Sequence, residues 1–195
     1  MLTPLCLLAR KYGCDKFGAK HSYSRWYWDT FQDRRETIRK VVEIGVGEGA
    51  SLYMWREFFP NATIYGADIE QRRVFCDERI MVYLCDQRKD ADVQQLIQHT
   101  GPDIDLLIDD GSHNPIDQVD TFLAAMPMLA PGATYVVEDV RFPWSPEDFP
   151  DYDVREPILE RRRRHDNRLI VVKHKQAQEV VTIYDNRPIV VRHHD

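Results

Sequence analysis

Apolar runs that end on acidic residues recur along the chain, and they constrain its fold more than any other feature. Four of these runs occupy residues 40–49 (KVVEIGVGEG), 62–70 (ATIYGADIE), 79–87 (RIMVYLCDQ) and 104–112 (IDLLIDDGS). A fifth, 132–140 (GATYVVEDV), follows a Pro-Gly step and ends in the same way. Runs that are apolar on both faces and are separated by helix-length segments are typical of parallel strands covered by helices.

The intervening segments carry helical patterns. Helices are predicted over residues 51–59, 90–100 and 115–126. The alternation of strands and helices predicts an α/β fold with a doubly wound, Rossmann-like sheet that is mostly parallel. After it we expect a helix over 155–166 and an antiparallel C-terminal hairpin of 168–174 with 179–187 that closes the sheet.

Size, charge and cysteine usage limit the class of protein. The 195 residues, 43% of them hydrophobic, suit a single domain, with a helical lid segment in 1–38 and the core in 39–195. The formal charge of -6 disfavours nucleic acid, whose binding needs a field of Lys and Arg. The four cysteines show no C-x-x-C spacing, which disfavours a zinc site or a disulfide frame. No stretch reaches the length of a membrane span, so we expect a cytoplasmic protein with no membrane partner.

Glycines and acids gather where the predicted strands end, which is the edge at which open α/β sheets bind ligands. Gly45, Gly47 and Gly49 form a G-x-G-x-G turn that lets backbone N–H groups approach a ligand closely. Asp68 follows about twenty residues later, at the end of the second strand, where an acid can accept hydrogen bonds from both hydroxyls of a ribose. A tight strand-to-helix turn with no ligand is the alternative interpretation.

Asp86 ends the third predicted strand and could receive an adenine amino group, or it could be a helix cap or a solvated turn residue. Together with the glycine turn and Asp68, it describes a nucleoside ligand. S-adenosylmethionine fits this site better than NAD, because the turn is not the G-x-G-x-x-G of dinucleotide enzymes. The positively charged amino group of S-adenosylmethionine could also pair with Glu43, near the first turn.

Several segments together resemble a known family. They are 14–31 (CDKFGAKHSYSRWYWDTF), 41–55 (VVEIGVGEGASLYMW), 64–69 (IYGADI), 85–88 (CDQR), 108–115 (IDDGSHNP) and 130–140 (APGATYVVEDV). In this order they resemble the metal-dependent class I methyltransferases that methylate sugar hydroxyls of antibiotics, such as the mycinamicin and rhamnosyl O-methyltransferases. We expect this chain to lack the separate N-terminal domain of the macrolide-sugar enzymes, and its segment after Arg141 resembles nothing in them.

The resemblance implies the residues of the site. The residues expected to bind S-adenosylmethionine are Glu43, Gly45, Gly47, Ser51, Asp68 and Asp86, and Asp109 and Tyr23 complete this set. Asp110, Glu138 and Asp139 would hold Mg²⁺ or Mn²⁺. His113 would be the general base, with Asp110 as the second catalytic residue.

The residue types support the metal site independently. Asp110, Glu138 and Asp139 follow two strands that we expect to be neighbours, and three adjacent carboxylates would raise one another's pKa unless a cation lay between them. Hard oxygen ligands favour Mg²⁺. Some of these acids could instead cap helix N-termini. His113 alone could be a solvated turn residue, but beside Asp110 it can take a proton as the acceptor oxygen attacks the sulfonium methyl.

Two aromatic segments, 21–31 and 141–149, could stack on an acceptor sugar or belong to the core or an interface. The basic run Arg161–Arg164 could be a solvated helix face or a site for an acidic substrate or RNA. We predict a divalent-metal-assisted O-methyltransferase of antibiotic biosynthesis, active on a hydroxyl of a sugar or glycosylated natural product and able to form a homo-oligomer. The alternatives are an NAD-dependent oxidoreductase and a non-catalytic nucleoside-binding domain. A nucleic-acid methyltransferase is disfavoured, because the chain has no N/D-P-P-Y/F motif.

Overall fold

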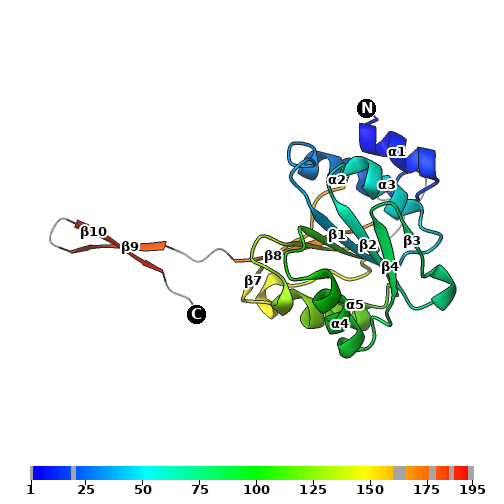
Figure 1. Cartoon of the computed structure of the whole chain (residues 1–195). Coiled ribbons are helices and arrows are strands. Elements are labelled where there is room, and N and C mark those ends of the chain that lie inside the picture. The colour runs from blue at the N-terminus through cyan, green and yellow to red at the C-terminus, as the bar shows by residue number, and fades with distance from the viewer. Residues whose placement is uncertain (1, 19–20, 160–165, 176–178, 185–186, 193–195) are drawn as a thin grey trace.

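The computed structural model describes residues 2–18, 21–159, 166–175, 179–184 and 187–192 (Figure 1). Its first half contains α1 (Pro4–Tyr12), α2 (Tyr23–Phe31), β1 (Lys40–Ile44), α3 (Ala50–Phe58), β2 (Thr63–Asp68), η1 (Gln71–Arg73), β3 (Cys76–Asp77) and β4 (Ile80–Leu84). Its second half contains α4 (Asp90–Thr100), β5 (Leu106–Asp109), α5 (Pro115–Ala125), η2 (Met126–Met128), β6 (Thr134–Val137), η3 (Pro146–Asp148), β7 (Tyr152–Arg155), β8 (Ile170–His174), β9 (Glu179–Tyr184) and β10 (Arg187–Arg192).

Among the described residues, eight strands form one sheet in the order β3-β4-β2-β1-β5-β6-β8-β7. Strands β4, β2, β1, β5 and β6 are parallel to one another, and β3, β8 and β7 pair antiparallel with their neighbours. Ile44 lies beside Asp109, and Asp109 lies beside Val137, so the carboxyl ends of β1, β5 and β6 are level. The chain order reverses between β1 and β5, which is where doubly wound sheets bind ligands.

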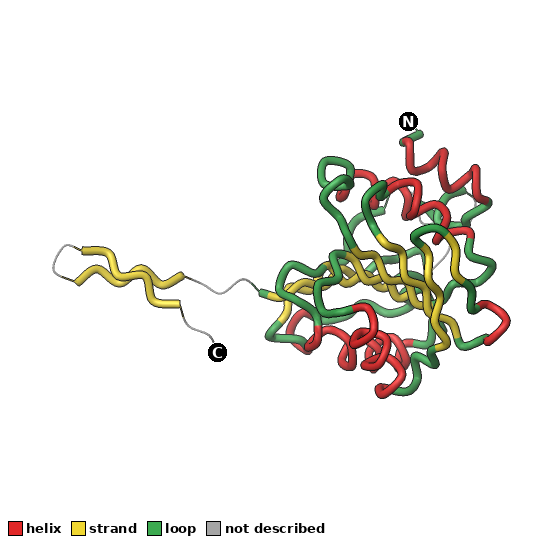
Figure 2. Tube along the Cα trace, in the orientation of Figure 1, coloured by secondary structure: helices red, strands yellow, loops and turns green. Residues whose placement is uncertain are grey.

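Helices cover both faces of the sheet, and the three layers are clear in Figure 2. Helices α1, α2 and α3 lie on one face, and α4 and α5 lie on the other. Successive residues of β1 point to opposite faces: Val41 packs in the core beneath α3, and Val42 packs in the core beneath α5. Both are fully buried, which explains why these strands are continuously apolar in the sequence.

Local capping fixes where α5 begins. The side chain of Asn114 accepts a hydrogen bond from the backbone N–H of Ile116, and Pro115 occupies the first helical position. These two residues end the loop that follows β5 and define the turn in which His113 lies. Residues Asp110 to His113 therefore connect a buried strand to a capped helix in one short segment.

The predicted α/β sheet is confirmed. The five apolar runs contain β1, β2, β4, β5 and β6, and the three predicted helices correspond to α3, α4 and α5 within a residue. Among the described residues no helix combines the length and the apolar character that crossing a membrane requires.

The C-terminal segments differ from the prediction. The predicted helix over 155–166 is wrong for the part of it that the structure describes, because Arg155 ends β7 and residues 156–159 have no regular structure. The basic run Arg161–Arg164 lies outside the described residues. An antiparallel C-terminal hairpin is present, but its partners are β9 and β10. Only two residues separate these strands, a length that favours local pairing. Strand β8 instead buries Ile170 and Val172 between β6 and β7 in the main sheet.

Candidate functional site

A cavity of about 830 Å³ opens at the carboxyl edge of the sheet, where the strand order reverses. Its wall includes the turn after β1, the ends of β2 and β4, and the loop after β5. The predicted site residues that line it are Gly45, Gly47, Ser51, Asp68, Asp86, Asp110 and His113. The others, which are not among its lining residues in the described chain, are Tyr23, Glu43, Asp109, Glu138 and Asp139. The structure thus brings most of the predicted cofactor residues to one surface.

The glycine turn needs glycine at two positions for different reasons. Gly45 has a φ of 89°, and a Cβ there would lie 2.0 Å from the carbonyl oxygen of Asp110, so the turn passes directly against the end of β5. Gly47 has a φ of 54°, and the nearest atom to a Cβ there would be Arg73 Nη1 at 3.6 Å. Its backbone therefore borders open space in the cavity, where a ligand can approach closely.

Asp68 closes the glycine turn from the neighbouring strand. Its Oδ2 accepts hydrogen bonds from the backbone N–H groups of Val46 at 3.1 Å and Gly47 at 3.2 Å, and its Oδ1 accepts from Glu70 N–H at 2.9 Å. Asp68 is buried but still lines the cavity. The carboxylate therefore shapes the turn and lies at the position predicted for ribose recognition.

Asp86 bonds as a turn residue and also faces the cavity. Its two oxygens accept from Nε and Nη2 of Arg88, at 2.8 and 2.9 Å. These hydrogen bonds hold the pKa of the Asp86 carboxyl below its ordinary value. The carboxylate is therefore ionised and able to accept a further hydrogen bond from a ligand.

Glu43 and Asp109 are fully buried beside the cavity. Ser51 Oγ donates to Glu43 Oε2 at 2.7 Å, which links the end of β1 to the first turn of α3. Asp109 accepts from Gln87 Nε2 at 3.1 Å and from Gly111 N–H at 3.3 Å, and burial raises the pKa of its carboxyl to about 7. In this structure both acids support the cavity from behind its lining.

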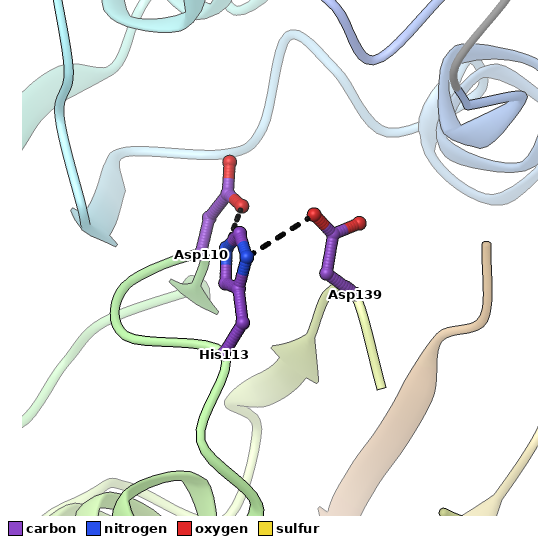
Figure 3. A group of neighbouring side chains, drawn as sticks. All are labelled: Asp110, His113 and Asp139. Atoms are coloured by element: carbon purple, nitrogen blue, oxygen red, sulfur yellow. Dashed lines mark hydrogen bonds and ion pairs between the residues drawn. The ribbon is translucent and has the colours of Figure 1, made fainter. Parts of the chain in front are cut away.

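Asp110, His113 and Asp139 form a cluster (Figure 3), and two of them, Asp110 and His113, line the cavity. Each offers one potential ligand atom, and these atoms all lie within 4.8 Å of one another. His113 Nε2 is 3.1 Å from Asp110 Oδ1, and its Nδ1 is 3.4 Å from Asp139 Oδ2. The hydrogen bond to Asp110 is the main cause that raises the pKa of His113 to about 9. The imidazole is thus held between the two aspartates.

Three non-glycine residues of the described chain have a positive φ, and two of them, His113 and Asp139, belong to this cluster, whereas the third is Arg79. His113 and Asp139 both have a φ of 54°, a left-handed conformation that is uncommon outside glycine. Such strain costs on the order of 1–3 kcal/mol per residue and concentrates at functional sites. Two strained residues whose side chains contact each other indicate a site that the surrounding fold holds in place.

Glu138 lies behind this cluster, although it was predicted as an equivalent ligand. It is almost fully buried, its Oε2 accepts from Lys16 Nζ at 2.8 Å, and its Oε1 accepts from Tyr27 OH at 2.7 Å. The adjacent Asp139 turns the other way, toward His113. The structure therefore brings Asp110 and Asp139 together and places Glu138 one layer deeper.

The N-terminal segment supplies partners that sequence reasoning missed. Lys16 pairs with three carboxylates, and His21 Nδ1 lies 3.2 Å from Asp139 Oδ1. Tyr23, which was predicted to bind the cofactor, donates a hydrogen bond to Asp139 Oδ1 at 2.6 Å. Both missed residues lie within the segment 14–31 that carried the family resemblance, which was the available signal.

The aromatic residues of the two segments 21–31 and 141–149 are buried or pack against the core, except Phe142, which is 66% exposed. Tyr23, Tyr27 and Phe31 are buried under α3, and Trp144 and Phe149 pack against Phe122 of α5. None of these five residues lines the cavity. The structure therefore favours the core interpretation for these five residues.

Comparison with known proteins identifies relatives of the chain. The family described as "Methyltransferase domain" matches residues 42–140, just over half of the sequence. The chain is 37% identical over 153 residues to 8-demethyl-8-alpha-L-rhamnosyl tetracenomycin-C 2'-O-methyltransferase of Streptomyces olivaceus, covering 75% of this chain and 40% of that protein. It is 36% identical over 140 residues to mycinamicin VI 2''-O-methyltransferase of Micromonospora griseorubida, covering 68% and 35%.

A solved structure matches the same region. The MycE methyltransferase from the mycinamycin biosynthetic pathway, in complex with Mg, SAH and mycinamycin VI, superposes with a TM-score of 0.64 at 37% identity. The match covers 70% of this chain and 39% of that one. The chain thus spans less than half the length of the relatives it matches.

Proposed function

The chain belongs to the family of methyltransferase domains, and from this premise we propose that it is an S-adenosylmethionine-dependent, divalent-metal-assisted O-methyltransferase. Its acceptor in this proposal is a hydroxyl of a sugar or glycosylated natural product in antibiotic biosynthesis. The relatives support this class, because their names describe O-methyltransferases that act on sugar-bearing tetracenomycin and mycinamicin compounds.

The cavity supports the choice of cofactor. It offers a glycine turn at which backbone borders open space, Asp68 at the position expected for the ribose and Asp86 at the end of the next strand. The MycE structure contains SAH, the demethylated form of this cofactor. We propose that Gly45, Gly47, Ser51, Asp68 and Asp86 contact it directly. In the proposal, Glu43, Asp109 and Tyr23 complete the site from the buried layer behind it.

The residues present also fit a divalent cation. Asp110 and Asp139 offer hard oxygen ligands close to each other, which suits Mg²⁺ or Mn²⁺, and Glu138 is the third carboxylate of the proposed set. When bound, such a cation would supply positive charge that orients an acceptor hydroxyl and lowers its pKa. MycE, solved with Mg, supports this part of the proposal.

The single observation that carries the proposal is the cluster of Asp110, His113 and Asp139, of which Asp110 and His113 line the cavity. In the proposal His113 takes the proton from the acceptor hydroxyl, for which its imidazole must be neutral. Asp110 orients the imidazole through the 3.1 Å contact with Nε2. Residues 1–38 act as a lid segment, which contributes Tyr23 and Lys16 to the acids at this edge.

The proposal includes three further expectations about partners and location: a small-molecule acceptor without nucleic acid, assembly as a homo-oligomer, and a cytoplasmic location. An NAD-dependent oxidoreductase and a non-catalytic nucleoside-binding domain are the competing functions. A binding assay that compares labelled S-adenosylmethionine with NAD distinguishes the proposal from the oxidoreductase. Metal-dependent turnover distinguishes it from the non-catalytic domain.

The test is a screen of the purified protein with S-adenosylmethionine and Mg²⁺ against glycosides and nucleotide sugars, followed by mass spectrometry. The expected result is a product heavier than its acceptor by one methylene group, lost when His113 is replaced by alanine. Tight binding of NAD together with no binding of S-adenosylmethionine would contradict the proposal.

A further inference from the structure

Lys16 places a buried ammonium group among three carboxylates from three different elements. Its Nζ lies 2.9 Å from Glu43 Oε1 on β1, 2.7 Å from Asp110 Oδ2 after β5, and 2.8 Å from Glu138 Oε2 after β6. Its side chain is 1% exposed. The contacts with Asp110 and Glu138 are hydrogen bonds donated by the ammonium group, and the contact with Glu43 is an ion pair.

We propose that Lys16 is a positioning residue of the site: by binding one oxygen of each carboxylate, it fixes the orientation of the acids at the cation cluster and joins them to the cofactor side of the cavity. This inference rests on the proposed function. Lys16 itself does not reach the reacting atoms in this proposal and acts only through the acids that it holds.

The division of oxygen atoms supports an orienting role. Asp110 Oδ2 accepts a hydrogen bond from Lys16, and this contact leaves Asp110 Oδ1 directed toward His113. Glu43 Oε1 forms an ion pair with Lys16, and Glu43 Oε2 accepts a hydrogen bond from Ser51, which lines the cavity. In both residues one oxygen contacts Lys16 and the other contacts a residue that lines the cavity, His113 or Ser51. Loss of the anchor would free the carboxyl groups to rotate.

Burial makes this anchor difficult to replace. Three carboxylates within reach of one point repel one another, and removing the ammonium group that lies between them leaves buried negative charge without a partner. Arginine is not equivalent, because its planar fork is larger and directs its donors in one plane. Lys16 also comes from the connection between α1 and α2, so it ties the N-terminal segment to the strand ends.

The experiment uses a charge-balanced pair. Lys16→Met with Glu43→Gln removes one positive and one negative charge, so the net charge of the cluster stays as in the wild type. Glu43→Gln alone shows the effect of the Glu43 change. Lys11→Met is the matched lysine control, because Lys11 pairs with Glu57 on the surface of α1 and α3.

For each variant we would measure Mn²⁺ affinity by electron paramagnetic resonance, SAH affinity by calorimetry, kcat and the melting temperature. We expect the double variant to remain folded and to bind SAH as Glu43→Gln does. The Mn²⁺ affinity of the double variant should be about 10- to 100-fold lower than that of Glu43→Gln, the usual effect of losing a group that orients metal ligands. Its kcat should fall in parallel. Lys11→Met should match the wild type.

The outcomes separate the two hypotheses. If the wild type binds Mn²⁺ and SAH, and the double variant binds Mn²⁺ within about twofold of Glu43→Gln, the positioning role is overturned and the proposed function stands. If the wild type binds neither, the proposed function fails and the role of Lys16 fails with it. Should the double variant not fold, Lys16→Met with Glu138→Gln, compared with Glu138→Gln alone, provides the same comparison.

Discussion

His113 Nδ1 lies 3.4 Å from Asp139 Oδ2, although the two residues follow different strands and both have left-handed backbone conformations. The contact requires β5 and β6 to be neighbours and both loops to leave the sheet at one level. Asp139 is held on its other side by Tyr23. Contacts from the surrounding fold therefore hold the cluster from both sides of Asp139.

Asp68→Ala should weaken SAH binding by about 1.5–3 kcal/mol, the range for a hydrogen bond to a charged group. The variant also removes the acceptor for the N–H groups of Val46 and Gly47, which loosens the turn. Calorimetric titration measures the change, and Asp68→Asn, which keeps one acceptor oxygen, should lose less. Unchanged affinity in a folded Asp68→Ala variant would remove Asp68 from the site.

Gly47→Val should abolish SAH binding. A branched side chain would enter the open space beside the turn and would have to adopt a φ of 54°, a genuine outlier for a β-branched residue. Gly132→Ala is the control, because a Cβ there meets nothing within 4 Å and no positive φ is required. Normal SAH binding by Gly47→Val would place the cofactor elsewhere on the sheet.

Chelation with EDTA should stop methyl transfer while SAH remains bound, because the proposed metal ligands follow β5 and β6, whereas the cofactor residues that line the cavity come from α3, the turn after β1 and the ends of β2 and β4. Added Mg²⁺ should restore turnover. Asp110→Asn should mimic chelation. Full turnover in EDTA, with no metal detected by elemental analysis, would return these carboxylates to a structural role.

Asp139→Asn and Glu138→Gln test which carboxylates hold the cation. Asp139 lies in the group with Asp110 and His113, whereas both oxygens of Glu138 bind Lys16 and Tyr27. We expect Asp139→Asn to weaken Mn²⁺ binding more than Glu138→Gln does. The reverse order would show that Glu138 leaves these partners to bind the metal directly.

His113→Ala should keep Mn²⁺ and SAH bound but lose on the order of 10²–10⁴ in rate, the usual contribution of general acid–base catalysis. Single-turnover measurements with saturating acceptor isolate this step. Its pH–rate profile should also lack the limb that reports the neutral imidazole. A rate within the range of the wild type would assign the proton transfer to another group.

The metal-free protein should lose stability as the pH rises from 6.5 to about 9, the interval between the ordinary pKa of histidine and the raised pKa of His113. A raised folded-state pKa means that the native state binds the proton more tightly, so the stabilisation is complete below 6.5 and is lost above 9. Melting temperatures in EDTA should therefore fall less steeply for His113→Asn. Parallel curves would show that the imidazole contributes no such linkage.

The local pattern of residues determined the secondary structure and the acidic edge. Apolar runs identified the five parallel strands, because strands buried on both faces must be continuously apolar, and Asn114-Pro115 marked the start of α5 through capping chemistry. Acids at the strand ends predicted a ligand site, because parallel strands bring their carboxyl ends to one edge.

Tertiary structure alone decided which of these acids meet. Lys16 binds Asp110 and Glu138 across 94 and 122 residues of sequence, and Glu138 and Asp139, although adjacent, point to different partners. Strand β8 likewise joined β6 because its apolar residues were buried there. Such contacts depend on distances and burial across the whole fold, which local spacing along the chain does not encode. The periodicity that produces strands and helices is local, so it can be read directly from the sequence.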